Sequence, residues 1–307
     1  MATNEPKKHH YVPQFYMRRF ACADDENKVM VLERHHQVVV ADRKSIEGIG
    51  YEERLHDYDD NGSPASIERA LNRAIETPFS ESSTWLKISS GNCASLDESD
   101  RLSLYGFARH LQLRNLEMLR FIETQHARFL VGELEEELTD DERDMHAWIA
   151  ANAGAAHELF RAGAMETTLP ADASGISVTV CQTPIALRSS TNPAVRLSHP
   201  GRDSVFGATF NSLRTWWLAL DRHWGAFIMA GGPVGFSIED VPPDLARVVN
   251  RQYLVQFLEG SARYMLADDA FLGEDLEWAG FGFDQQTTRG FRYRKLSRVT
   301  KPRGVHD

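Results

Sequence analysis

The stretch KKHHYVPQFYMRRF, residues 7–20, places two cationic pairs, two imidazoles and several aromatic rings around one proline. Val12 precedes the proline and is therefore expected to be extended, whereas Pro13 suits the first position of a helix. We predict an extended lead-in followed by a short helix that ends near Phe20. Tyr16 lies four residues before Phe20, so both side chains share one helical face, which we expect to point into the core.

The two histidines precede the N-terminus of this predicted helix, which makes them candidates for chemistry. The positive end of a helix dipole favours a bound anion and a neutral imidazole, and a general base or metal ligand requires the neutral form. We predict that His10 is a general base, that Gln14 positions a substrate oxygen, and that His9 and Arg18 bind an anionic substrate. The alternative is that His10 caps the helix and the aromatic side chains only fill the core.

A second group of polar side chains lies in RHLQLRNLEMLR, residues 109–120, inside a run predicted to be helical. His110 and Arg114 are four residues apart and therefore share one stripe of the helix. We predict that Arg114 stabilises the negative charge of a transition state, and that Arg109 and His110 belong to the binding surface. A solvated face held by salt bridges explains the same pattern.

A third candidate is SSTNPAV, residues 189–195, at the end of a predicted strand. Polar side chains at such a position often line a pocket, so we predict that Asn192 positions the substrate and that Ser190 contributes to binding. An Asx-type turn explains the same residues without any function. The functional hypothesis depends on one spatial prediction, namely that His10, Arg114 and Asn192 meet at one hollow open to solvent.

Composition places the chain among ordinary globular proteins. Of its 307 residues, 42% are hydrophobic and 25% are charged, which is typical of a protein that buries a core. The longest apolar passage carries Asp221, Arg222 and His223 at its centre, and such residues are costly in lipid. We therefore expect a cytoplasmic protein with no membrane partner. The three cysteines are isolated and show no spacing typical of a zinc site.

The net charge of −10 is unevenly distributed. Residues 1–20 carry +3 and residues 289–307 carry +6, which leaves −19 for residues 21–288. Basic ends on an acidic body either neutralise that body or contact a polyanion. We predict that residues 289–307 form a basic tail. Together with the N-terminal motif, it would reach nucleic acid or another anionic ligand through Arg292, Arg294 and Lys295.

Hydrophobic patterning predicts an α+β fold with a mixed or antiparallel sheet and a large helical middle section. We expect one domain over residues 1–288, with helices over about 95–166 and a strand-rich part over about 175–236. A capping pattern at Ser95–Glu98 is expected to open a helical run that reaches about Leu138.

The sequence contains none of the common phosphate-loop, dinucleotide, zincin or hydrolase-elbow patterns. No metal site is predicted, and no cofactor, substrate or oligomeric state is assigned.

Several phrases resemble, in order, bacterial proteins of the domain-of-unknown-function 4238 family. They are KKHHYVPQFYMRRFA, KVMVLER, SIEGIGYEERLHDYD and SIERALNRAIE. That family typically opens with HHYVPQFYL and carries a later phrase close to Thr-Ser-Asp-Asn-Pro-Val. The resemblance places Thr191 where the family usually has aspartate. It also implies one spatial group made of His10, Pro13, Gln14, Tyr16, Arg114, Asn192 and Pro193. It implies no activity.

Two functions remain open from the sequence. The first is a hydrolase or nuclease-like enzyme that acts on a phosphodiester or another anionic substrate, with His10 as general base. The second is a module that binds an anionic ligand or nucleic acid without chemistry, in which HHYVPQFY is a structural plug.

Overall fold

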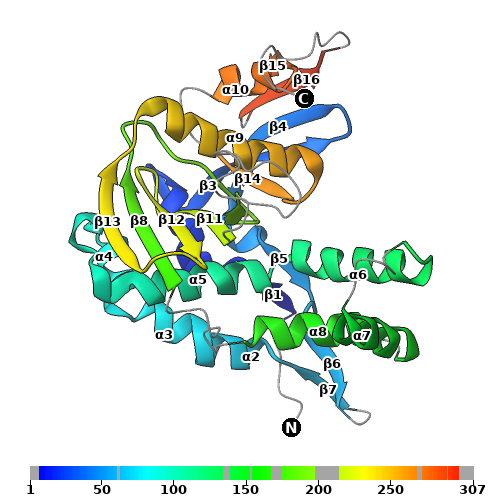
Figure 1. The fold of residues 1–307 in the computed structure, drawn as a ribbon. Helices are drawn as coiled ribbons and strands as arrows, with labels where there is room; N and C mark the ends of the chain where they lie inside the picture. Colours follow the sequence, from blue (N-terminus) through cyan, green and yellow to red (C-terminus); the bar gives the residue numbers. More distant parts are fainter. Residues whose placement is uncertain are drawn as a thin grey trace.

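Strands from both halves of the chain form two large sheets in the computed structural model (Figure 1). The structure describes residues 7–60, 63–133, 139–152, 154–166, 175–197, 214–267, 272–288 and 290–296. Helices and strands both contribute large shares, and most strand pairs are antiparallel. The predicted α+β class is therefore confirmed.

The first sheet is built around a long hairpin of β3 (Asp25–His35) and β4 (Val38–Ser45). The turn between them places His36 at a φ of 55°. The strand order is β15-β16-β4-β3-β14-β9, and β2 also pairs with β3. The remaining strands of this sheet are β2 (Ala21–Cys22), β9 (Ser189–Ser190), β14 (Tyr264–Leu266), β15 (Phe281–Gln286) and β16 (Gly290–Lys295).

The hairpin β15–β16 corrects the expectation of a loose basic tail that begins at residue 289. β16 pairs with β15 on one side and with β4 on the other, and Tyr293 is buried in the core beneath it. The sequence here is polar because one face of the hairpin is solvated, which is usual for an antiparallel strand. The rest of the predicted tail, namely residue 289 and residues 297–307, lies outside the described residues.

The second sheet has five strands in the order β10-β11-β12-β8-β13. All pairs are antiparallel except β8 with β13, which run parallel, so the sheet is mixed. Its strands are β8 (Ile176–Gln182), β10 (Ala194–Arg196), β11 (Arg214–Ala219), β12 (Trp224–Ala230) and β13 (Gly235–Asp240). Both Trp216 and Trp217 are buried, although successive side chains of a strand point to opposite faces. Both faces of this sheet are therefore covered.

The helical layer differs from the long run predicted up to Leu138. It consists of α5 (Arg101–Leu113), α6 (Leu116–Leu130), α7 (Asp140–Ala151) and α8 (Ala155–Ala164). The break falls at Arg114 and Asn115, where the Asn115 side chain accepts a 3.0 Å hydrogen bond from the Glu117 amide and caps α6. α5 packs on the five-stranded sheet, while α6, α7 and α8 extend to one side of the molecule (Figure 1).

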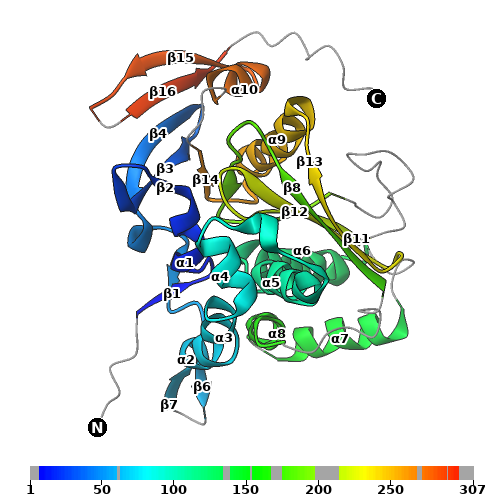
Figure 2. The same cartoon turned by 90° about the vertical axis from the view of Figure 1, so that its left-hand side faces the viewer.

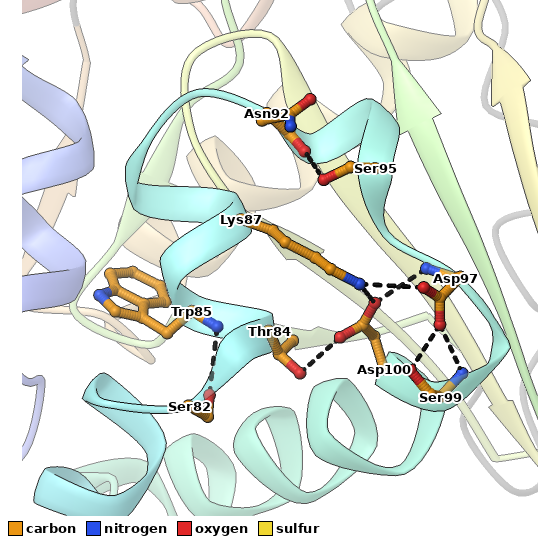
Figure 3. A network of polar contacts seen from close by, with 9 residues as sticks. All are labelled: Ser82, Thr84, Trp85, Lys87, Asn92, Ser95, Asp97, Ser99 and Asp100. Atoms are coloured by element: carbon orange, nitrogen blue, oxygen red, sulfur yellow. Dashed lines mark hydrogen bonds and ion pairs between the residues drawn. The ribbon is translucent and has the colours of Figure 1, made fainter.

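A buried polar network fixes the start of α5 (Figure 3). The capping box joins Asp97 and Asp100, two residues later than the pattern predicted at Ser95–Glu98. The buried Asp100 carboxylate accepts hydrogen bonds from Thr84 and Lys87, both at 2.7 Å, and from the Asp97 amide. It therefore holds α4 (Ser83–Ser89) to the helical layer.

Two hydrophobic cores meet at α9 (Pro243–Glu259). Ala246, Val249 and Tyr253 of α9 pack into the larger core, and Leu254 and Phe257 pack into the smaller one under the β3–β4 hairpin. The larger core also takes in five side chains of the N-terminal motif, namely Tyr11, Val12, Tyr16, Met17 and Phe20. The motif thus contributes directly to the core.

The other elements are short. They are β1 (Lys8–His10), α1 (Gln14–Met17), η1 (Arg18–Phe20), η2 (Ile46–Gly48), β5 (Tyr51–Glu53), β6 (Asp57–Asp60), β7 (Ser63–Ser66), α2 (Glu68–Leu71), η3 (Asn72–Glu76), α3 (Thr77–Ser80), η4 (Cys93–Ser95), η5 (Glu98–Asp100) and α10 (Leu272–Trp278). Within the described ranges, none of the helices has the length and apolar character needed to cross a bilayer.

Candidate functional site

The N-terminal motif borders a pocket of 620 Å³ that opens beside β1 and α1. Figure 2 shows α1 next to β1, with α4 and α5 on its other side. The side chains around the pocket come from the motif, from η2 and from the helix that starts at Glu68. They are Lys7, Lys8, His10, Gln14, Phe15, Arg18, Glu47, Glu68, Asn72 and Glu76.

The strand β1 separates the two histidines of the motif because successive side chains point to opposite faces. His10 is half-buried and lines the pocket, whereas His9 is fully buried. The His9 Nδ1 accepts a 2.9 Å hydrogen bond from the His56 amide, and its ring stacks on the His56 ring at 5.6 Å. His9 was predicted to bind substrate, but the structure places it in the interior, away from the pocket.

The His10 ring is held in the form that a general base requires. The Gln14 amide donates to His10 Nε2 at 3.3 Å, which makes that nitrogen the acceptor of a neutral imidazole. Burial lowers the pKa of His10; a hydrogen bond to the Glu47 backbone opposes this shift, and the charges of Arg114 and Lys8 add to it. The expected helix dipole plays little part, since α1 has only four residues.

Arg114 holds the backbone of His10 and does not reach the pocket. Its guanidinium is completely buried, donates through Nη2 to the His10 carbonyl oxygen, and forms an ion pair with Glu76 through Nη1. Nη1 also lies 3.1 Å from His110 Nε2. Burial lowers the pKa of Arg114 to about 10. The predicted role of charge stabilisation in contact with a substrate is thus replaced by a positioning role.

Two glutamates that the sequence hypothesis missed complete the pocket. Glu68, Asn72 and Glu76 are spaced by four residues and face the pocket together. The His10 backbone amide and the Asn72 side chain both donate to the Glu68 carboxylate, and burial raises its pKa. The repeated spacing in SIERALNRAIE was the available signal. The π-helical turn over Asn72–Glu76, a feature common at functional sites, is not visible in the sequence.

The pocket carries charges of both signs. Lys7, Lys8 and Arg18 are exposed cations of the lining, and Glu47 is an exposed carboxylate of the same lining. Of the two deeper carboxylates, Glu76 is already paired with Arg114. The cations at the mouth can therefore attract an anion, while the interior offers an imidazole and a carboxyl group. No set of three metal-ligating side chains is grouped within the described residues.

Residues 8–165, just over half of the chain, match the family described as "Protein of unknown function (DUF4238)". The chain belongs to this family. Apart from Lys7, every residue that lines the pocket lies inside the part that matches DUF4238. No curated protein and no solved structure matches the chain.

The segment Ser189–Pro193 lies beyond the DUF4238 match and is a crossover between the two sheets. β9 belongs to the seven-stranded sheet and β10 to the five-stranded one. Ser190 Oγ donates to the Asn192 carbonyl oxygen and accepts from the Asn192 amide, so these residues form a local turn. Both are buried and neither lines the pocket. The prediction of one hollow shared by His10, Arg114 and Asn192 is therefore wrong for the last two.

Thr191 occupies the position where the DUF4238 resemblance places an aspartate. Its buried Oγ1 accepts hydrogen bonds from the backbone amides of Arg263, at 2.9 Å, and Tyr264, at 3.0 Å. A carboxylate accepts from backbone amides in the same manner. The geometry therefore supports an anchoring role at this position, which threonine retains.

The other predicted binding residues lie at separate places. Arg109 and His110 line a different hollow of 300 Å³, and burial lowers the pKa of His110 to about 4. Arg292, Arg294 and Lys295 are on β16. Arg292 Nε contacts Asp284 Oδ2 at 2.6 Å and Arg294 Nη2 contacts the same oxygen at 3.4 Å, so both charges are partly compensated.

Proposed function

We propose that the pocket beside β1 is the active site of a hydrolase that acts on a phosphodiester or another anionic substrate, with His10 as general base. One observation carries the proposal: a half-buried, neutral imidazole and three cations line the same pocket. Neutral imidazole accepts a proton near neutral pH, and exposed cations bind a phosphate.

The reaction follows from this arrangement. His10 Nε2 takes a proton from a water molecule once the substrate displaces the Gln14 amide, and the water oxygen attacks phosphorus. The bond from phosphorus to the leaving oxygen breaks, and that oxygen receives a proton from the imidazolium or from Glu68. Because burial raises the pKa of Glu68, its carboxyl group keeps a proton at a higher pH than an exposed glutamate does.

The remaining side chains bind and orient the substrate. Arg18, Lys7 and Lys8 contact the phosphate oxygens at the mouth, and Gln14 holds the attacking water or a substrate oxygen. Arg114 and Glu68 fix the His10 backbone through its carbonyl oxygen and its amide. The imidazole is therefore preorganised, because the strand that carries it cannot shift without breaking two buried hydrogen bonds.

Replacing His10 tests the proposal. We expect His10→Asn to lower kcat on bis(p-nitrophenyl) phosphate or a short oligonucleotide by at least about 100-fold, the usual contribution of a general base. The melting temperature should stay unchanged, since the ring is half-buried and asparagine keeps a polar group there. His157→Asn is the matched control, because His157 is an exposed side chain on α8. Equal turnover in His10→Asn and the wild type would exclude the role of His10.

A binding module without chemistry is the second candidate. It is favoured by the Gln14 contact, which occupies the acceptor nitrogen of His10 as a purely structural bond would. This candidate predicts that the wild-type protein binds phosphate or an oligonucleotide in equilibrium dialysis without any turnover. A large fall in the melting temperature of His10→Asn, with no binding in the wild type, would instead indicate a structural plug.

A further inference from the structure

A second pocket, of 430 Å³, lies between α9, the start of α6 and β10, and shares no lining residue with the His10 pocket. Its volume is within the range of roughly 300–1,000 Å³ found for small-molecule sites. α9 contributes one stripe at the spacing i, i+3, i+4, i+7. The lining residues are Gln112, Glu117, Met118, Phe121, Ala194, Val195, Arg196, Gln252, Val255, Gln256, Glu259 and Ser261.

Arg196 supplies a positive charge to this pocket that no other described residue compensates. It is half-buried on the edge strand β10, and its Nε is shielded from water without a hydrogen-bond partner. Within the described ranges no salt bridge neutralises it, and burial alone lowers the pKa of its guanidinium. A partly buried cation without a counter-ion attracts an anionic group more strongly than a fully solvated one does.

Other walls offer apolar contact and hydrogen-bond acceptors. The Phe121 side chain is 56% exposed and lies with Met118 and Val255 around the pocket. The Gln256 Oε1 is buried without a hydrogen-bond partner, so it can accept from a ligand N–H. Each unsatisfied buried polar atom in a native structure calls for an explanation, and a bound ligand supplies one.

Two carboxylates, those of Glu117 and Glu259, also line the pocket. Burial raises the pKa of Glu117; a hydrogen bond with Ser261 and the charge of Arg120 oppose this shift, and the charge of Glu259 adds to it. The described residues contain no ion pair between Arg196 and either glutamate. The pocket thus presents a positive wall and a negative wall that do not neutralise each other, which disfavours a polyanion such as nucleic acid.

We propose that this second pocket binds the C-terminus of a short peptide as a zwitterion. The peptide carboxylate pairs with Arg196, a backbone N–H donates to Gln256 Oε1, and an apolar C-terminal side chain packs on Phe121. The ammonium group of a dipeptide then faces Glu117 and Glu259. A guanidinium is suited to this task because its planar donors match both oxygens of a carboxylate.

Titration of the full chain with the dipeptide Ala-Leu tests the proposal. We expect Ala-Leu to bind in isothermal titration calorimetry, and both its C-terminal amide and its N-acetyl form to bind at least about tenfold more weakly. Arg196→Gln should weaken the binding of Ala-Leu by a similar factor. It should leave the affinity for the C-terminal amide, which is already low, unchanged. Arg128→Gln is the matched control, since Arg128 is a half-buried arginine of α6, as Arg196 is of β10, and lies outside this pocket.

Two results would overturn the proposal. One is that Ala-Leu does not bind to a wild-type protein whose melting curve shows it to be folded. The other is that the amide binds as tightly as the free carboxylate. His10→Asn should leave Ala-Leu binding intact because the two pockets share no residue, so the outcome is independent of the hydrolase proposal.

Discussion

At the scale of single residues, adjacent side chains of one strand have separate tasks. His9 packs against His56 in the interior, and His10 faces the pocket. The alternation of a strand alone produces this division. The sequence predicted His10 as a general base and His9 as a binding residue, and it could not show that His9 is buried, because the face on which each one lies depends on the pairing of β1 with β5.

Two buried histidines should make the fold sensitive to acid. Burial lowers the pKa of His56 to about 2 and that of His110 to about 4, against an ordinary value of 6.5. Below pH 6.5 the unfolded chain therefore binds protons that the folded chain does not. We expect the free energy of unfolding to fall from pH 6.5 toward pH 4, by up to about 1.4 kcal/mol per pH unit for each histidine. Glu68, with its raised pKa, partly offsets this slope.

Urea unfolding at about pH 7, 6 and 5 in the wild type and in His56→Phe measures this dependence. Phenylalanine can occupy the site between His9 and Phe160 without a proton to gain, so the variant should lose less stability on acidification. His35→Phe is the control, because the His35 side chain is exposed. Parallel pH profiles for His56→Phe and the wild type would contradict the prediction.

At the scale of elements, the capping network at the start of α5 shows that local sequence predicts roughly where a helix begins but not which residue caps it. The sequence pattern located a helix start to within a few residues, but it chose Ser95 where the structure uses Asp97 and Asp100. The Ser95 hydroxyl instead donates to the Asn92 carbonyl oxygen (Figure 3). The sequence alone cannot show which of the two overlapping capping patterns forms, because the one that forms depends on a hydrogen bond from Thr84 of α4 to Asp100.

Substitutions at Asp100 and Ser95 test which of the two capping patterns stabilises the protein. We expect Asp100→Ala to lower the free energy of unfolding by about 3 kcal/mol, because it removes a buried carboxylate with several partners. Ser95→Ala should change it by no more than about 0.5 kcal/mol, as for an exposed site. Chemical denaturation of both variants gives the comparison. A larger loss in Ser95→Ala than in Asp100→Ala would restore the cap predicted from the sequence.

At the scale of the whole molecule, the crossover at Ser189–Pro193 and the helix α9 join two sheets with separate cores. The polar side chains of the crossover are buried because the chain leaves one sheet for the other and cannot keep a regular ladder there. Ser190 and Thr191 then satisfy backbone groups that no strand partner reaches. This explains a buried run of hydroxyl groups that the sequence presents as a possible binding site.

Because β16 pairs with β4 in the seven-stranded sheet, we can predict how far the chain can be shortened without loss of stability. A chain that ends at Leu296 keeps every described contact of β16 and should melt within about 1 °C of the full protein. A chain that ends at Thr288 lacks β16, leaves the β4 edge unpaired, and should melt at least about 5 °C lower. Differential scanning calorimetry measures both. Equal melting temperatures for the two shortened chains would restore the view of residues 289–307 as a tail without structural importance.

The α+β class, the extended lead-in and short helix of the motif, and the family could all be predicted from the sequence alone. All of these depend on local patterning or on an uninterrupted phrase. Which polar residues face solvent became visible only in the folded chain. Arg114 and Thr191 are buried and satisfy backbone groups of segments distant in sequence. Glu68 on α2 and Glu76 in the π-helical turn line the pocket instead. Such roles depend on long-range packing, which a single sequence does not reveal.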